Sequence, residues 1–158
     1  ETLQKIRIWL VGDLAGVTMQ MLYTSLAPSA LALGLALFIA PRLNVLELGD
    51  HVATGLGVSI RQIRFLTILA AALCAGTAVS LVGPIGFVGL IVPNLVRYLN
   101  GNNYRQAIPL TVLAGAILLI LADLAARMVL LPHEIPTGIA TALVGVPVFI
   151  MIVIRTSR

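Results

Sequence analysis

The sequence predicts an all-α, polytopic membrane helix bundle with about five transmembrane helices. Of its 158 residues, 59% are hydrophobic and only 10% are charged. Soluble domains carry about 25% charged residues, so this composition is typical of a membrane protein. Each crossing of a hydrocarbon core needs about 20 apolar residues, which limits the chain to five or six spans. The basic residues are spread between the hydrophobic runs, and this excludes a nucleic-acid-binding surface.

The apolar runs place the elements in order along one transmembrane domain, residues 1–158. Residues 1–21 form a mixed external segment, and the expected spans cover residues 22–41, 65–82, 84–99, 107–131 and 137–155. The first span should end at Pro41 and Arg42. Between spans one and two, residues 42–64 alternate apolar and charged side chains and are interrupted by glycines. This stretch predicts two short amphipathic helices at the membrane surface.

The basic residues also set the orientation of the bundle. Placing residues 42–64 inside leaves seven of the ten basic residues on the cytoplasmic side: Arg42, Arg61, Arg64, Arg97, Arg105, Arg155 and Arg158. Only Lys5, Arg7 and Arg127 are then external. The sequence therefore predicts an external N-terminal segment and a cytoplasmic C-terminal end.

The third expected span is interrupted by residues that weaken a helix. Glycines allow close backbone approach, and prolines remove a backbone donor that must be replaced by protein or water in a membrane. Such a segment indicates either a translocation pathway or a kinked packing helix. The candidate pathway residues are Gly83, Pro84, Gly86, Gly89, Pro93 and Asn94.

Two charged residues fall inside the fourth span. Asp123 and Arg127 are four apart and can meet on one helix face, so we expect a structural ion pair near the outer interface. Neither a phosphate-binding loop nor the Ser/His or paired carboxylate sets of an intramembrane enzyme occur in the sequence. One His and one carboxylate, His133 and Glu134, cannot complete a metal shell, so no metal site is expected.

Several blocks of the sequence, in order, resemble the iron-siderophore and vitamin B12 permeases of ABC importers, the FecCD-type family. These blocks are Trp9-Leu10-Val11-Gly12-Asp13, Leu46-Glu47-Leu48-Gly49, Leu56-Gly57-Val58, the run from Gly83 to Pro93, the run from Leu121 to Arg127, and the run from Glu134 to Pro147. The resemblance implies a ten-span permease, of which this chain would supply the C-terminal half. One departure is Asn94, where the family commonly has His.

The resemblance also implies roles for particular residues. The cytoplasmic loop would dock on a separate ATP-binding subunit through Leu46, Glu47, Leu48, Gly49, Asp50, Val52, Leu56 and Gly57. Without the resemblance, an amphipathic helix lying on lipid headgroups is the favoured explanation of this loop. Arg127 would receive an acidic residue of the external substrate-binding protein, because its fork can hold a carboxylate by two hydrogen bonds.

The expected function is therefore a non-enzymatic permease subunit in the bacterial cytoplasmic (inner) membrane, importing an iron-siderophore complex or a related metal chelate. The alternatives are a vitamin B12 or haem importer permease, or a structural membrane subunit with no pathway of its own. The chain should bind no cofactor, since ATP and Mg belong to the partner ATPase. A second permease subunit or an N-terminal half, the substrate-binding protein and the lipid membrane are the other expected partners.

Overall fold

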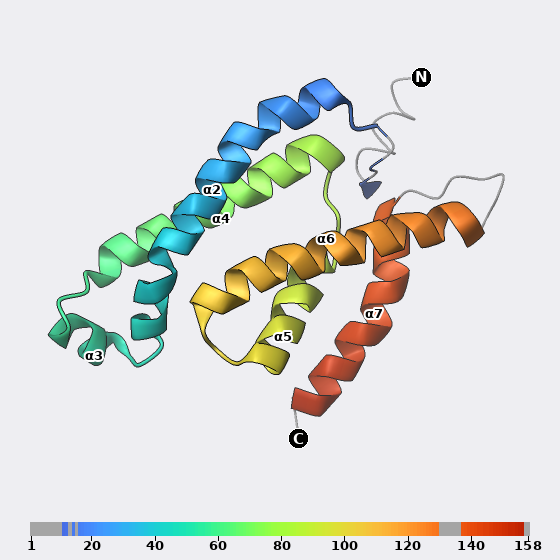
Figure 1. Cartoon of the computed structure of the whole chain (residues 1–158). Helices are drawn as coiled ribbons and strands as arrows, with labels where there is room; N and C mark the ends of the chain where they lie inside the picture. The colour runs from blue at the N-terminus through green and yellow to red at the C-terminus, as the bar shows by residue number, and fades with distance from the viewer. Residues whose placement is uncertain (1–10, 13, 15, 130–136, 157–158) are drawn as a thin grey trace.

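The computed structural model describes residues 11–12, 14, 16–129 and 137–156, and these residues form helices joined by short connections (Figure 1). The helices are α2 (Met19–Leu46), α3 (Asp50–Gly55), α4 (Ile60–Val82), α5 (Val88–Asn100), α6 (Tyr104–Val129) and α7 (Thr137–Thr156). No strand occurs in this part of the chain. The expected all-α bundle is therefore confirmed. The predictions made for residues 1–10 (Lys5, Arg7 and Trp9), for Asp13, for residues 130–136 and for Arg158 lie outside the described residues.

Within the described part of the chain, three helices are long and apolar enough to cross a membrane: Met19–Leu46, Ile60–Val82 and Tyr104–Met128. Helix α5 has 13 residues. At a rise of 1.5 Å per residue it is about 20 Å long, less than the roughly 30 Å of a hydrocarbon core. The third expected span is thus a short helix that is reached through the non-helical residues 83–87.

The long helices form two groups of neighbours, α2 with α4 and α5 with α6 and α7, and α6 connects the two groups through its contact with α2. Helix α2 lies along α4, while α5, α6 and α7 contact one another, and α2 also contacts α6 (Figure 1). The buried cluster of the second group joins Val92 and Val96 of α5 to Ala107 of α6. In α2 and α4 the buried residues include Ala32, Ala40 and Ala70, and such small side chains allow membrane helices to approach closely.

Two sequence predictions for the 42–64 loop are wrong in detail. Helix α2 does not end at Pro41 but continues to Leu46. A proline removes only its own backbone donor, so the turn that follows Pro41 can stay helical. Glu47 N donates to Leu43 O at 3.1 Å in this last turn. Helix α4 begins at Ile60, five residues before the expected span. The remaining stretch has room for one short helix, α3, rather than two.

Contacts between helix ends define two ends of the bundle. At one end lie α3, the last turn of α2 and the first turn of α6, joined where Tyr104 N donates to Asn44 Oδ1 at 2.8 Å. At the other end, Gly138 N donates to Gly12 O at 2.9 Å. The described arginines divide between these ends as the charge pattern predicts: Arg127 lies at the Gly12 end, and the α3 end carries Arg42, Arg61, Arg64, Arg97 and Arg105.

Candidate functional site

The segment that joins α2 to α4, residues 46–57, presents apolar side chains to the outside. We call it the coupling segment. The exposed fractions are 66% for Leu48, 46% for Val52 and 64% for Leu56, whereas Ala53 is fully buried. One side of α3 therefore packs inward, and three large apolar side chains project from an end of the bundle that is rich in arginine. Exposed apolar patches with a polar rim are typical of protein or membrane contact sites.

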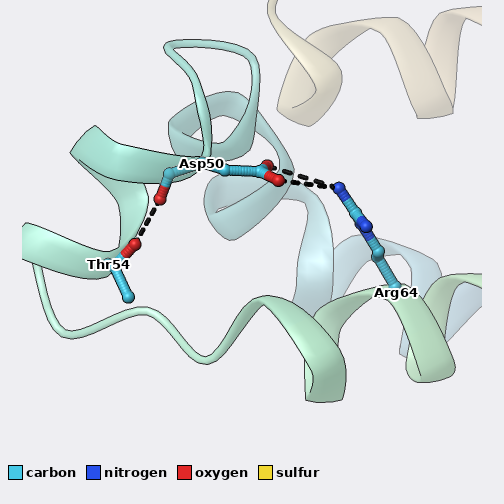
Figure 2. A network of polar contacts seen from close by, with 3 residues as sticks. All are labelled: Asp50, Thr54 and Arg64. Atoms are coloured by element: carbon cyan, nitrogen blue, oxygen red, sulfur yellow. Dashed lines mark hydrogen bonds and ion pairs between the residues drawn. The ribbon is translucent and has the colours of Figure 1, made fainter.

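The coupling segment is held in a fixed place by its turns and by one ion pair. Gly49 and Gly57 flank α3 with φ of 107° and 75°, values that favour glycine. Figure 2 shows the Asp50 carboxylate facing Arg64 of α4, with Oδ2 and Oδ1 at 3.0 and 3.3 Å from Nη2. The Thr54 hydroxyl donates to the Asp50 carbonyl within α3. Both charged side chains are exposed, so their pair is worth at most about 1 kcal/mol, but it orients α3 on α4.

The non-helical approach to α5 begins at Gly83 and ends at Phe87. Gly83 caps α4 with φ of 73°, and Val88 N donates to Gly86 O at 2.8 Å. Phe87 has φ of 66° and is the only non-glycine residue with positive φ in the described ranges. A bulky residue in this region is strained by roughly 1–2 kcal/mol. The sequence offered no signal for Phe87, because only its flanking glycines suggest an irregular backbone.

The candidate pathway residues lie on two parts of this segment. Pro84, Gly86, Gly89 and Asn94 are exposed, while Gly83 is buried and Pro93 is half-buried within α5. Asn94 Nδ2 donates to Leu90 O at 2.8 Å, so its side chain is bonded to its own helix.

None of these residues lines the apolar cavity of about 330 Å³ between α5, α6 and α7, which is formed by Ile91, Val92, Leu95, Ala114, Ile117, Leu118, Leu121 and Gly145. The α5 residues that line the cavity are Ile91, Val92 and Leu95, and they do not include Gly89 or Asn94.

At the opposite end, Asp123 links two helices. Its Oδ2 atom is 2.9 Å from Arg127 Nε, and its Oδ1 atom accepts a hydrogen bond from the Thr137 hydroxyl of α7 at 3.0 Å. The spacing of four residues predicts the ion pair, but the contact with buried Thr137 had no signal in the sequence. The Arg127 side chain remains 58% exposed. Its two Nη groups make no hydrogen bond to the described residues.

No group of three or more His, Cys, Asp or Glu side chains that could hold a metal occurs in the residues that the structure describes. The one cysteine, Cys74, is exposed on α4. The described residues thus place an exposed apolar patch and two ion pairs at one end of the bundle, and an exposed arginine at the other.

The long apolar helices, the interrupted α5 and the exposed coupling segment define a polytopic membrane protein of the transporter-permease class. The sequence profile of the FecCD transport family matches residues 1–155. The chain belongs to this family, a family of transport permeases.

Individual relatives agree with this assignment. The chain is 42% identical over 155 residues to the iron(3+)-hydroxamate import system permease protein FhuB of Bacillus subtilis, covering 98% of this chain and 40% of FhuB. It is 41% identical over 153 residues to the vitamin B12 import system permease protein BtuC of Vibrio cholerae, covering 97% of this chain and 46% of BtuC. The chain therefore spans less than half the length of these relatives.

A solved structure has the same fold. It was described as a metal-chelate type ABC transporter in an inward-facing conformation, and it matches with a TM-score of 0.90 at 37% identity. The match covers 97% of this chain and 51% of that chain. The predicted resemblance to FecCD-type permeases is therefore confirmed by sequence and by structure.

Proposed function

We propose that this chain forms part of the membrane pathway of an ATP-driven importer that moves an iron-siderophore complex or a related metal chelate across the bacterial cytoplasmic membrane. The chain contributes no ATP hydrolysis of its own. A separate ATP-binding subunit holds ATP and Mg and docks on the coupling segment. The exposed pathway residues of the third span, together with the rest of the permease, line the route of the substrate.

The observation that carries this proposal is the exposure of Leu48, Val52 and Leu56 at the arginine-rich end of the bundle. Positive charge favours the cytoplasmic side, where the ATP-binding subunit is located. A short helix with an apolar outer face fits a cleft in a partner protein, and it transmits a rigid-body movement better than a flexible loop would. The ion pair between Asp50 and Arg64 links this helix to α4.

Vitamin B12 import is the second candidate, and the similarity to BtuC favours it as a specific alternative. The two substrates differ in size and chemistry, but the exposed pathway residues are small or apolar apart from Asn94. Such walls suit passage rather than tight binding, so selection belongs to an external substrate-binding protein. We propose that this partner docks at Arg127.

The experiment that tests the proposal is capture of candidate ATP-binding subunits by the purified chain in detergent. The wild-type chain should capture its ATPase, and Leu48→Asp and Leu56→Asp should each abolish capture, because a charge would enter the apolar contact. Ser59→Asp is the matched control. It adds the same charge in the same loop, at an exposed residue that caps α4, and should leave capture unchanged.

Two outcomes would contradict this mechanism. Equal capture by Leu48→Asp and the wild-type chain would show that the exposed leucines do not form the contact. Failure of the folded wild-type chain to capture any ATPase, with firm binding to lipid vesicles through the same leucines, would favour a surface helix on the membrane.

A further inference from the structure

The carboxylate of Glu47 contacts Arg97 of α5, whereas the side chain of the next residue, Leu48, is exposed. Glu47 caps the C-terminus of α2 and is the residue directly before Leu48. Its Oε1 atom is 3.0 Å from Nη2 of Arg97, which lies in the last turn of α5. The guanidinium of Arg97 also lies 5.6 Å from the centre of the Tyr104 ring in the first turn of α6. Three helices therefore meet around one arginine.

Asn44, one turn earlier in α2, makes a second connection at the same place. Its Nδ2 group donates to Asn103 Oδ1 at 3.0 Å, and its Oδ1 atom accepts from Tyr104 N at 2.8 Å. Asn44 thus bonds to the first residue of α6 and to the residue before it. The Glu47 and Asn44 side chains therefore bind the end of α2 to residues around the α5–α6 turn that lie 50 to 60 positions later in the sequence.

We propose that Glu47, Arg97 and Asn44 are positioning residues that transmit displacement of the coupling segment to α5. The inference rests on the proposed function, since it assumes that an ATPase moves this segment. Helix α3 is joined to Glu47 by only two residues, so a shift of α3 pulls directly on the Glu47–Arg97 contact.

The geometry of helix α5 allows it to move when α3 is displaced. It is short, its Arg97 end is tied to Glu47, and its other end follows the glycine-containing, non-helical residues 83–87. A rigid helix that is held at one end and reached through an irregular backbone at the other can rotate as a unit. Gly89 and Asn94 are both exposed on α5, so this rotation would change the directions in which they face. On the other side of the coupling segment, the Asp50–Arg64 ion pair connects α3 to α4 (Figure 2).

The test uses the complete transporter, with this chain, its ATPase and its binding protein, reconstituted in liposomes. Uptake and ATP hydrolysis are measured for Glu47→Gln, Arg97→Gln and the charge exchange Glu47→Arg with Arg97→Glu. Both ion-pair side chains are partly exposed, at 29% for Glu47 and 42% for Arg97. We therefore expect each single variant to lower uptake per ATP hydrolysed by roughly two- to fivefold. Arg97 lies outside the coupling segment, so ATPase capture by Arg97→Gln should stay at the wild-type level.

The charge exchange should recover most of this ratio, because the attraction is restored with reversed polarity. Arg105→Gln is the matched control. It removes a cation from the same end of the bundle, its side chain makes no ion pair with the described residues, and its uptake per ATP should remain that of the wild type.

Wild-type uptake per ATP in both single variants would overturn the inference, and so would a charge exchange that behaves no better than the single variants. Loss of ATPase capture in Arg97→Gln would also overturn it, because Arg97 would then act in binding rather than in transmission. A wild-type assembly that neither captures the ATPase nor takes up a metal chelate would instead refute the proposed function.

Discussion

Gly138 and Gly12 are joined by a backbone hydrogen bond of 2.9 Å, from Gly138 N to Gly12 O, although they are more than 120 positions apart. A Cβ atom at Gly138 would overlap the carbonyl oxygen of Val11. A Cβ atom at Gly12 would lie 3.0 Å from Pro84 O. The Val11–Gly12 backbone is therefore enclosed between the start of α7 and the approach to α5, and the two glycines allow this packing.

The first prediction follows from this enclosure. Gly138→Ala should lower the free energy of unfolding by about 1–3 kcal/mol or more, since a backbone oxygen must move to admit the methyl group. The measurement is denaturant unfolding of the purified chain in detergent. Gly115→Ala is the control, because no atom lies within 4 Å of its added Cβ, and alanine favours the helix by up to about 1 kcal/mol. Equal stability of the two variants would contradict the close packing.

The second prediction concerns the strained backbone of Phe87. Phe87→Ala and Phe87→Gly both remove the ring, but only alanine keeps a Cβ at φ of 66°. We expect the glycine variant to be the more stable by about 1 kcal/mol, as measured by chemical unfolding. The same pair of substitutions at Leu95, within α5, should give the opposite order by about 1 kcal/mol. An alanine variant at Phe87 that equals the glycine variant would show that the strain is absent.

The regular parts of this fold could be predicted from sequence because apolar runs of span length report burial in lipid directly. The expected ends of the second and fifth spans fall within one residue of the described helix ends at Val82 and Thr156. The error at Pro41 arose because a proline is a strong local signal, while its effect on a long helix depends on the turns that follow it. Local pattern cannot supply that information.

The candidate site was predictable only where its signal is local. The exposure of Leu48 and Leu56 and the spacing of Asp123 and Arg127 follow from positions near one another in sequence. Arg97, the partner of Glu47, is 50 residues distant in the sequence, and no pattern distinguishes it from the other arginines at the α3 end. Such contacts depend on how the helices pack, so they appear only in the three-dimensional structure.

The third prediction concerns the contact between α5 and α7. A Cβ atom at Gly145 would lie 2.8 Å from Ile91 Cδ1 and 2.9 Å from Phe87 Cβ. Gly145→Ala should therefore destabilise the chain by about 1–3 kcal/mol, and Ile91→Val alone by about 0.5–1.5 kcal/mol. Because valine removes the clashing Cδ1 atom, the double variant should lose less than the sum of the two single changes.

A double-mutant cycle of unfolding free energies measures this coupling. Gly89→Ala provides the control partner, since its added Cβ would meet no atom within 4 Å. Combined with Ile91→Val, it should give an additive result to within about 0.5 kcal/mol. Additivity of Gly145→Ala with Ile91→Val would contradict the contact between the two residues.

The last prediction tests Arg127 as the docking residue for the substrate-binding protein. Arg127→Gln should weaken binding of that protein by roughly two- to fivefold at low salt, because the lost pair is exposed. The remaining affinity should depend less on ionic strength, which titration calorimetry over a salt series can measure. Asp123→Asn should not weaken binding, since it removes only the internal partner of Arg127 Nε. Arg105→Gln, a loss of the same charge at the α3 end, should leave both affinity and salt dependence unchanged. If Arg127→Gln binds as tightly as the wild type at low salt, the external carboxylate is received elsewhere, and the exposed guanidinium serves only its ion pair with Asp123.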